Sequence, residues 1–173
     1  MNYTLGGAFN SRINLNLRED KGYTYGARSG FNGGETRGTY RASAGVRADT
    51  TAASITEFVK EISDFHKNGI TEKELAFTKS AIGQRDARAY ETPSQKLGFL
   101  SQMMTYNLEP SFVDEQAAIL QNITKTEIDA LAAKHLNLND MVMVVVGDKA
   151  KHLDEVKALG YPVVELDPDG NPL

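Results

Sequence analysis

Two neighbouring stretches near the start of the chain show the alternation of a β-hairpin. Residues 23–33 and 36–47 are rich in Tyr, Thr, Phe, Val and Ala, residue types that favour strands. Asn32-Gly33-Gly34-Glu35 between them is a strong turn signal. The alternation predicts that one face of the first strand carries Tyr23, Tyr25, Ala27, Ser29 and Phe31.

Apolar residues at helical spacing fill most of the rest of the chain. Residues 3–17 predict two short helical pieces separated at Gly6-Gly7. Thr71 with Glu74, and Thr124 with Glu127, have the spacing of capping boxes and mark two helix starts. Together these signals predict helices over residues 51–68, 72–90, 93–104, 112–120, 125–135 and 150–159.

Two strand-like segments follow the helices. Residues 141–146 form a continuous apolar run, which predicts a strand buried on both faces, and residues 161–166 predict a short terminal strand. Strands and helices are segregated along the chain, as in α+β proteins. We therefore expect one domain over residues 1–173, with an antiparallel or mixed sheet covered on one face by helices.

Composition narrows the function classes. The net charge of −4 argues against nucleic acid as a partner, because phosphate binding needs a basic surface. Arg37, Arg41 and Arg47 fall in one strand-like stretch, which favours a solvated strand face. The chain has no cysteine, hence no disulfide or thiolate metal site. No apolar run approaches the length of a membrane helix.

Candidate chemistry gathers around Gly22, where Arg18 and Tyr25 lie close together in the sequence. A guanidinium and a phenol beside a glycine-rich bend can both donate hydrogen bonds to a carbonyl oxygen. The alternatives are a salt-bridging arginine at a helix end and an ordinary strand tyrosine.

An ordered set of short motifs around these residues resembles the pitrilysin, insulysin and mitochondrial processing peptidase family of zinc metallopeptidases. The resemblance is to the domain of that family that lacks the zinc, and it extends over essentially the whole chain. The motifs are Leu5-Gly6-Gly7, Ser11-Arg12-Ile13, Leu17-Arg18-Glu19, Gly22, Tyr25-Gly26, residues 69–75, 106–108 and 123–128, and Val144-Val145-Val146-Gly147-Asp148.

The resemblance implies two homologous halves that enclose a chamber and have different roles. A zinc-bearing partner domain or subunit would hold the metal, and this chain would supply Arg18 and Tyr25 to the backbone of an unfolded peptide. The chain alone should then be inactive. A peptidase-like scaffold without a role in hydrolysis is the alternative, and an unrelated α+β binding module is a third. Periplasmic location is suggested by the resemblance alone, and a cytoplasmic one stays open.

The histidines do not form a zinc motif. Zinc catalysis needs three protein ligands, and the family's motif is His-x-x-Glu-His. His152-Leu153-Asp154-Glu155-Val156 comes nearest, but valine stands where the second histidine belongs. His66 and His135 fall near predicted helix ends, where imidazolium is favourable. Acid pairs Asp154-Glu155 and Glu72/Glu74 fall in helix first turns. We expect no metal and no catalytic residue of its own in this chain.

The resemblance also begins late, since only four residues precede Leu5-Gly6-Gly7. We therefore expect an N-terminally truncated domain that lacks the first strands of its sheet. An incomplete sheet exposes an edge. This predicts self-association through that edge or a changed sheet topology.

Overall fold

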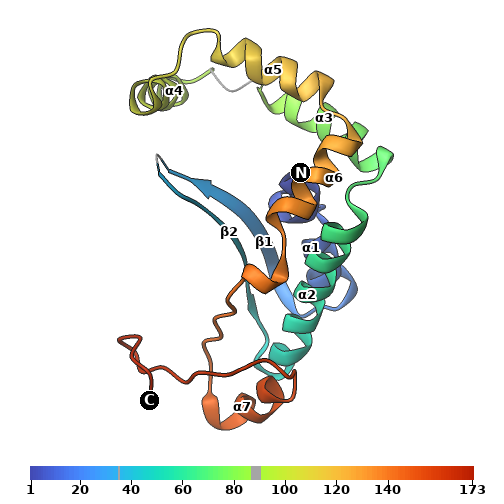
Figure 1. The fold of residues 1–173 in the computed structure, drawn as a ribbon, viewed down its shortest axis with the longest axis vertical. Helices are drawn as coiled ribbons and strands as arrows, with labels where there is room; N and C mark the ends of the chain where they lie inside the picture. The colour runs from blue at the N-terminus through green and yellow to red at the C-terminus, as the bar shows by residue number, and fades with distance from the viewer. Residues whose placement is uncertain (35, 87–90) are drawn as a thin grey trace.

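A two-stranded antiparallel sheet with helices on one face is the centre of the fold. The computed structural model describes residues 1–34, 36–86 and 91–173. Strand β1 (Thr24–Gly33) pairs with β2 (Gly38–Val46). The N-terminal helices and α2 (Thr51–Asn68) lie on one side of this ribbon, and the opposite side is open (Figure 1). The predicted hairpin, α+β class and one-sided helical cover are confirmed.

Three short helical segments dock the N-terminus onto β1. They are η1 (Tyr3–Gly7), α1 (Arg12–Asn14) and η2 (Leu15–Asp20), where η1 and η2 are π-helical turns. A Cβ on Gly6 would lie 2.2 Å from Ser29 Oγ, so only glycine permits this approach of η1 to β1. Asn14 Oδ1 accepts from the Ala27 N–H at 3.0 Å, and Asn2 Nδ2 donates to the Ser29 carbonyl at 2.8 Å. These two asparagine side chains thereby hydrogen-bond backbone groups of β1 on the edge that does not face β2.

The core lies between these segments and the helices. Phe65 and Ile62 of α2 supply the apolar face that the sequence predicts, and Ile128 and Ala132 come from α6 (Lys125–His135). The other fully or nearly fully buried apolar side chains are Leu5, Ile13, Leu17, Ala27, Ile70, Leu75 and Leu136.

Capping chemistry sets several helix boundaries. Helix α3 (Glu72–Asp86) begins at the predicted capping box, in which Glu74 Oε2 accepts from the Thr71 N–H at 2.8 Å. Thr124 and Glu127 form the second predicted box, at the start of α6. The predicted continuation of α3 through residues 87–90 lies outside the described residues.

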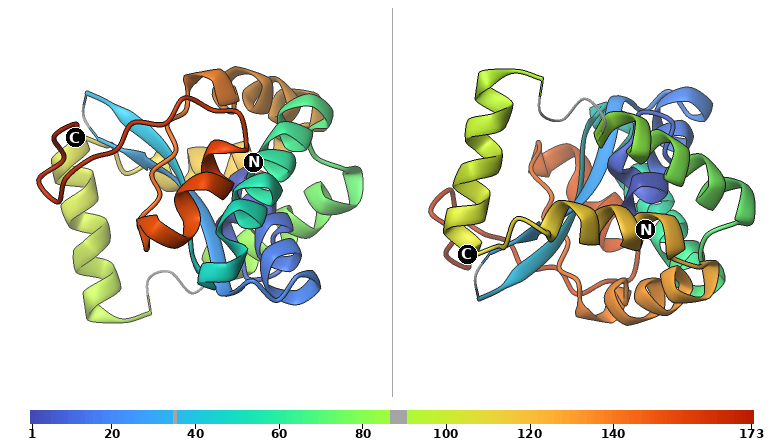
Figure 2. Two further views of the ribbon diagram at one scale, coloured as in Figure 1. Left: turned by 90° about the horizontal axis from the view of Figure 1, so that it is seen from below. Right: turned by 90° about the horizontal axis from the view of Figure 1, so that it is seen from above.

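The remaining helices lie towards the two ends of this centre, with α3, α5 and α4 at the top of Figure 1 and α7 at the bottom, and Figure 2 shows the same arrangement from below and above. Helix α4 extends away from it with no fully buried residue, so the apolar side predicted for this helix is largely in solvent. No helix in the described ranges is long and apolar enough to cross a membrane. The elements are η3 (Ala48–Thr50), α4 (Pro93–Tyr106), α5 (Phe112–Asn122), η4 (Leu138–Asp140) and α7 (Lys149–Lys157).

The two predicted C-terminal strands are wrong. Residues 141–146 are not paired, and Val142, Val144 and Val146 are 89%, 80% and 95% exposed. Residues 161–166 form only an isolated bridge, between Leu166 and Pro172. A strand needs a neighbouring strand to pair its backbone, and in the described structure neither segment is hydrogen-bonded into the β1–β2 sheet.

Candidate functional site

A hollow of about 560 Å³ lies at the base of the hairpin, where η2 passes into β1. Arg18 and Tyr25, the two residues singled out in the sequence, both line it. The rest of its wall comes from the loop between them and from the end of β2: Glu19, Gly22, Tyr23, Thr24, Gly45, Val46 and Arg47. The structure thus brings the two predicted site residues to one concave surface.

The turn at Gly22 creates this arrangement. Gly22 has φ = +63°, a left-handed conformation that glycine adopts without strain. Its N–H donates to the Arg18 carbonyl at 3.2 Å, and the Tyr23 N–H donates to Leu17 at 2.8 Å, which closes the wide π-helical turn of η2. The Arg47 N–H donates to the Tyr23 carbonyl at 2.9 Å and ties the end of β2 to the same point.

A β-bulge directs Tyr25 into solvent. The pairing register shifts between Thr24 and Ala27, so one extra residue of β1 faces β2 there. Tyr25 is 99% exposed, whereas Ala27 and Ser29 are buried. The predicted common face for Tyr25, Ala27 and Ser29 is therefore wrong, because the bulge resets the alternation. The phenol is left free to meet a ligand.

The Arg18 side chain stacks on an aromatic ring and lies beside an acid. Its guanidinium carbon lies 4.4 Å from the centroid of the Phe9 ring, a cation–π contact. Nη1 lies 3.3 Å from Glu19 Oε1. The contact is an ion pair without hydrogen-bond geometry, and this buried nitrogen has no hydrogen-bond partner in the described structure. Because Nη1 itself is out of contact with solvent, a ligand in the hollow would meet the exposed remainder of the side chain, which is 32% exposed as a whole.

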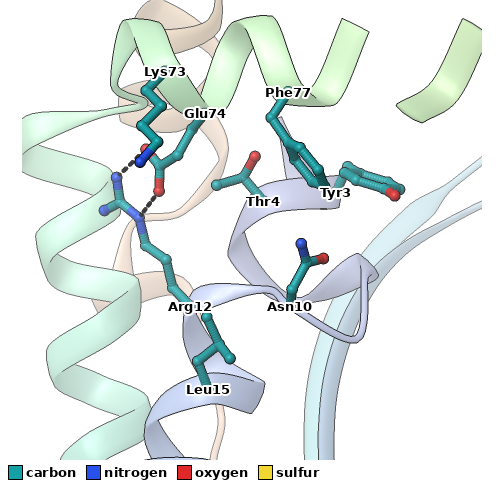
Figure 3. Close-up of a pocket in the computed structure, with 8 residues that line it drawn as sticks. All are labelled: Tyr3, Thr4, Asn10, Arg12, Leu15, Lys73, Glu74 and Phe77. Atoms are coloured by element: carbon teal, nitrogen blue, oxygen red, sulfur yellow. Dashed lines mark hydrogen bonds and ion pairs between the residues drawn. The ribbon is translucent and has the colours of Figure 1, made fainter. Parts of the chain in front are cut away.

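The neighbouring motif residue Arg12 has a different, structural role. Its Nε and Nη2 donate to Glu74 at 2.6 and 2.7 Å, and Nη1 donates to Asp64 at 3.0 Å. These bonds raise the pKa of Arg12, although burial opposes them. Figure 3 shows this pairing in a second hollow, of about 430 Å³, where Tyr3 and Phe77 lie near each other. Arg12 joins α1 to α2 and α3, and with a further bond to the Gly69 carbonyl it uses four of its five N–H donors within the fold.

The zinc that the family implies does not fit the residues of this chain. Among the described residues, no group of three or more His, Asp or Glu side chains converges on a point where a metal could bind. His66 Nδ1 lies 3.4 Å from the Ala132 carbonyl, and His135 packs against Phe31. His152 is on α7. The hollow thus presents a guanidinium and a phenol, and among the described residues it holds no set of metal ligands.

The sequence interpretation missed Arg47, which lines the hollow from the far end of the hairpin. Its guanidinium pairs with Asp49, Nη2 to Oδ2 at 2.5 Å. The hairpin pattern contained the information, because pairing a strand that starts near residue 24 with one that ends near residue 46 places residue 47 beside Tyr23. Glu19 and Tyr23 adjoin predicted residues in the sequence and needed no separate signal.

Comparisons with known proteins were made against families, curated proteins and solved structures. Residues 1–82 match a family described as the peptidase M16 inactive domain. The solved M16 inactive domain from Pseudomonas fluorescens is 30% identical, with a TM-score of 0.71, over 79% of this chain and 32% of that one. A candidate zinc protease from Bordetella pertussis Tohama I shares the fold, with a TM-score of 0.63 at 12% identity, over 80% of this chain and 77% of that one.

One curated relative has a name that bears on activity. The "Non-peptidase homolog YmxG" of Helicobacter pylori (strain ATCC 700392 / 26695) is 23% identical over 151 residues. The match takes in 87% of this chain and 35% of that protein. The chain therefore spans about a third of the length of both this relative and the Pseudomonas fluorescens domain structure.

Proposed function

The chain is related to the inactive domain of the M16 peptidases, as its sequence predicted, and from that relationship we propose that it completes the peptide-binding chamber of a zinc peptidase. In this proposal residues 1–173 act as one domain beside a homologous zinc-bearing domain or subunit. The partner would carry the zinc and perform hydrolysis, and this chain would position the substrate. Alone, the chain would have no peptidase activity.

Arg18 and Tyr25 would act as hydrogen-bond donors to one carbonyl oxygen of a bound peptide. The guanidinium and the phenol can each donate to that oxygen, since Tyr25 is almost fully exposed and the Arg18 side chain is partly exposed. Donors fixed in advance stabilise negative charge that develops on the oxygen during acyl transfer. Phe9 and Glu19 would hold Arg18 in position, while the bulge would hold Tyr25 away from the sheet.

The observation that carries this proposal is the near-complete exposure of Tyr25 at 99%, beside a partly unsatisfied Arg18. Several of the other N-terminal motif residues have structural roles in the fold. Gly6 permits close packing, Arg12 joins three helices, and Ile13 and Leu17 are in the core. Tyr25 makes no such contribution, and a large ring held in solvent by a bulge has the character of a ligand contact.

Kinetics with a zinc-bearing partner provide the test. We expect that Arg18→Ala and Tyr25→Phe, each in the assembled peptidase, lower kcat/KM by about 10²–10³, the usual effect of losing one such donor. The measurement is steady-state cleavage of an unstructured peptide by the partner mixed with each variant. Tyr161→Phe, a half-exposed phenol in the C-terminal tail, is the matched control and should leave kcat/KM unchanged.

A further measurement separates function from folding. Thermal unfolding of each variant alone should show that Tyr25→Phe has the stability of the parent chain, since Tyr25 is almost fully exposed and its hydroxyl has no hydrogen-bond partner among the described residues. Full activity of both variants at unchanged substrate affinity would overturn the assigned roles.

A catalytically silent scaffold is the second candidate, because the Helicobacter pylori relative is named a non-peptidase homolog. In that case the chain would bind a homologous partner without serving hydrolysis. A partner complex that assembles normally but cleaves no peptide, with or without Arg18→Ala, would favour this function over the first.

A further inference from the structure

The side of the hairpin that faces away from the helices carries an unusual distribution of charge. Cross-strand pairs Arg28–Ser43, Gly30–Arg41 and Asn32–Thr39 lie on this side, which we call the open face. Every member except Gly30 is exposed, while the alternating pairs Ala27–Ala44 and Ser29–Ala42 face the helices. The open face is thus polar, made largely of small side chains, and contains two arginines and no acid.

Arg28 and Arg41 are diagonal neighbours on this face. Arg28 is paired with Ser43 and Arg41 with Gly30, which puts the two positions about 7–8 Å apart, within reach of long side chains. Neither guanidinium forms an ion pair within the part of the chain that the structure describes. Like charges placed side by side repel, and nothing in the described fold offsets the repulsion.

The hairpin contrasts in charge with the rest of the protein. Residues 21–47 hold five basic side chains, Lys21, Arg28, Arg37, Arg41 and Arg47, and a single acid, Glu35. Lys21 and Arg47, at the two ends, pair with Asp20 and Asp49, so the arginines of the open face contribute much of the excess positive charge. The whole chain has a net charge of −4, so its remaining parts are strongly acidic. A local positive potential in an acidic protein attracts an anionic ligand to that surface.

The open face leads directly to the hollow. Gly45 continues the exposed positions of β2 beyond Ser43 and lines the hollow together with Arg18 and Tyr25. Along a strand, Gly45 is about 7 Å from Ser43 and about 13 Å from Arg41. An extended peptide with one carbonyl in the hollow would therefore pass Arg28 and Arg41 about two to four residues away from that carbonyl.

We propose that the open face selects acidic peptide segments, with carboxylates of the substrate pairing with Arg28 and Arg41. The proposal rests on the proposed function, because it takes the hollow as the place where the substrate carbonyl binds. Arginine suits the task, since its guanidinium can meet a carboxylate through two parallel hydrogen bonds. The occupant is a peptide in extended conformation, with glutamate or aspartate two to four residues from the bond held at Arg18 and Tyr25.

Direct binding to the full chain tests this selection. Two fluorescent peptides of the same sequence, one with a pair of glutamates and one with glutamines in their place, are titrated with the protein and followed by anisotropy. We expect the acidic peptide to bind about threefold to tenfold more tightly at low salt, with the difference shrinking as ionic strength rises. Arg28→Gln combined with Arg41→Gln should abolish the difference.

The control variant removes the same amount of charge elsewhere. Lys67→Gln combined with Lys134→Gln changes two exposed side chains of the helical layer and should keep the preference. Loss of the preference in this variant too would overturn the proposal, because only net charge would then matter.

The remaining outcomes distinguish this proposal from the proposed function. Equal binding of both peptides would overturn the acidic selection and leave the peptide-positioning role intact. If the arginine variant instead loses only its affinity for a zinc-bearing partner, the open face is a protein interface and the acidic selection is wrong. The positioning role itself stands or falls with the Arg18 and Tyr25 kinetics.

Discussion

The ionisation of Glu74 contributes to the stability of the fold. Burial by itself raises the pKa of Glu74, but hydrogen bonds from Arg12 and from the backbone and hydroxyl of Thr71 outweigh it, and the pKa falls to about 2. Since the pKa is lower in the folded than in the unfolded chain, the carboxylate stabilises the protein above about pH 4.5. We predict that this contribution, on the order of 2–3 kcal/mol, is lost as the pH falls from about 4.5 to about 2.

Urea unfolding measured across that pH range checks the prediction. Glu74→Gln should lower the free energy of unfolding at neutral pH and flatten its dependence on acid pH. Glu72→Gln, an exposed acid in the same helical turn, is the control and should behave as the parent chain does. An unchanged pH profile in Glu74→Gln would contradict the assignment.

At Tyr40 we expect a substitution to raise the free energy of unfolding, in contrast to Glu74→Gln. Its hydroxyl is buried without a hydrogen bond among the described residues, and its ring lies 4.9 Å from Phe31, centroid to centroid. Burial raises the pKa of Tyr40 to about 12, although the nearby Ser29 hydroxyl, which itself donates to Asn2 Oδ1 at 2.7 Å, partly opposes the rise. Removing an unsatisfied buried hydroxyl relieves its desolvation cost. We predict that Tyr40→Phe raises the free energy of unfolding by about 1 kcal/mol in urea titrations, whereas a loss of stability would reveal a partner for the hydroxyl.

Among the helices, the end of α2 depends on a glycine and the middle of α3 does not. Gly69 has φ = +67°, and a Cβ there would lie 1.8 Å from Asp129 Oδ1, which accepts from the Ile70 N–H. We predict that Gly69→Ala costs about 2–4 kcal/mol, from strain and from the displaced carboxylate. Gly83 is an exposed helical residue with no atom near its Cβ position, so Gly83→Ala should stabilise the chain by about 0.5–1 kcal/mol. Thermal unfolding of both variants distinguishes the two, and equal effects would contradict the argument.

Elements with local signals were predictable from the sequence, and elements that need distant partners were not. The hairpin turn, the capping boxes at Thr71 and Thr124, and the end of α2 at Asn68-Gly69 are encoded within a few residues. Residues 141–146 have the composition of a buried strand, but composition cannot supply the strand that would pair with them.

The candidate site was predictable in part for the same reason. Arg18 and Tyr25 are near each other in sequence, so a short turn is enough to bring them to one hollow. The bulge that exposes Tyr25 depends on how β2 pairs with β1, and the alternation of side chains in β1 alone predicted the wrong face. The open face likewise appears only when Arg28 and Arg41 are brought together by the strand register.

For the molecule as a whole, two surfaces are able to pair with a strand of another molecule. They are the exposed run at residues 141–146 and the outer edge of β2. The edge of β2 has no pairing partner in the described structure, and the run is apolar and β-branched. Such surfaces promote strand pairing between molecules. The expectation from the sequence, self-association through an exposed sheet edge, remains a prediction for which these surfaces provide the physical basis.

Sedimentation velocity over a range of concentrations tests this self-association, in which the partner is a second copy of the chain. We predict that the parent chain forms dimers or larger species as concentration rises. Val144→Lys should shift it towards monomer, because a charge in the middle of the run opposes edge pairing. Leu173→Lys changes an equally exposed apolar residue outside the run and should leave the association unchanged. A chain that stays monomeric at every concentration would show that these surfaces do not pair with a second copy.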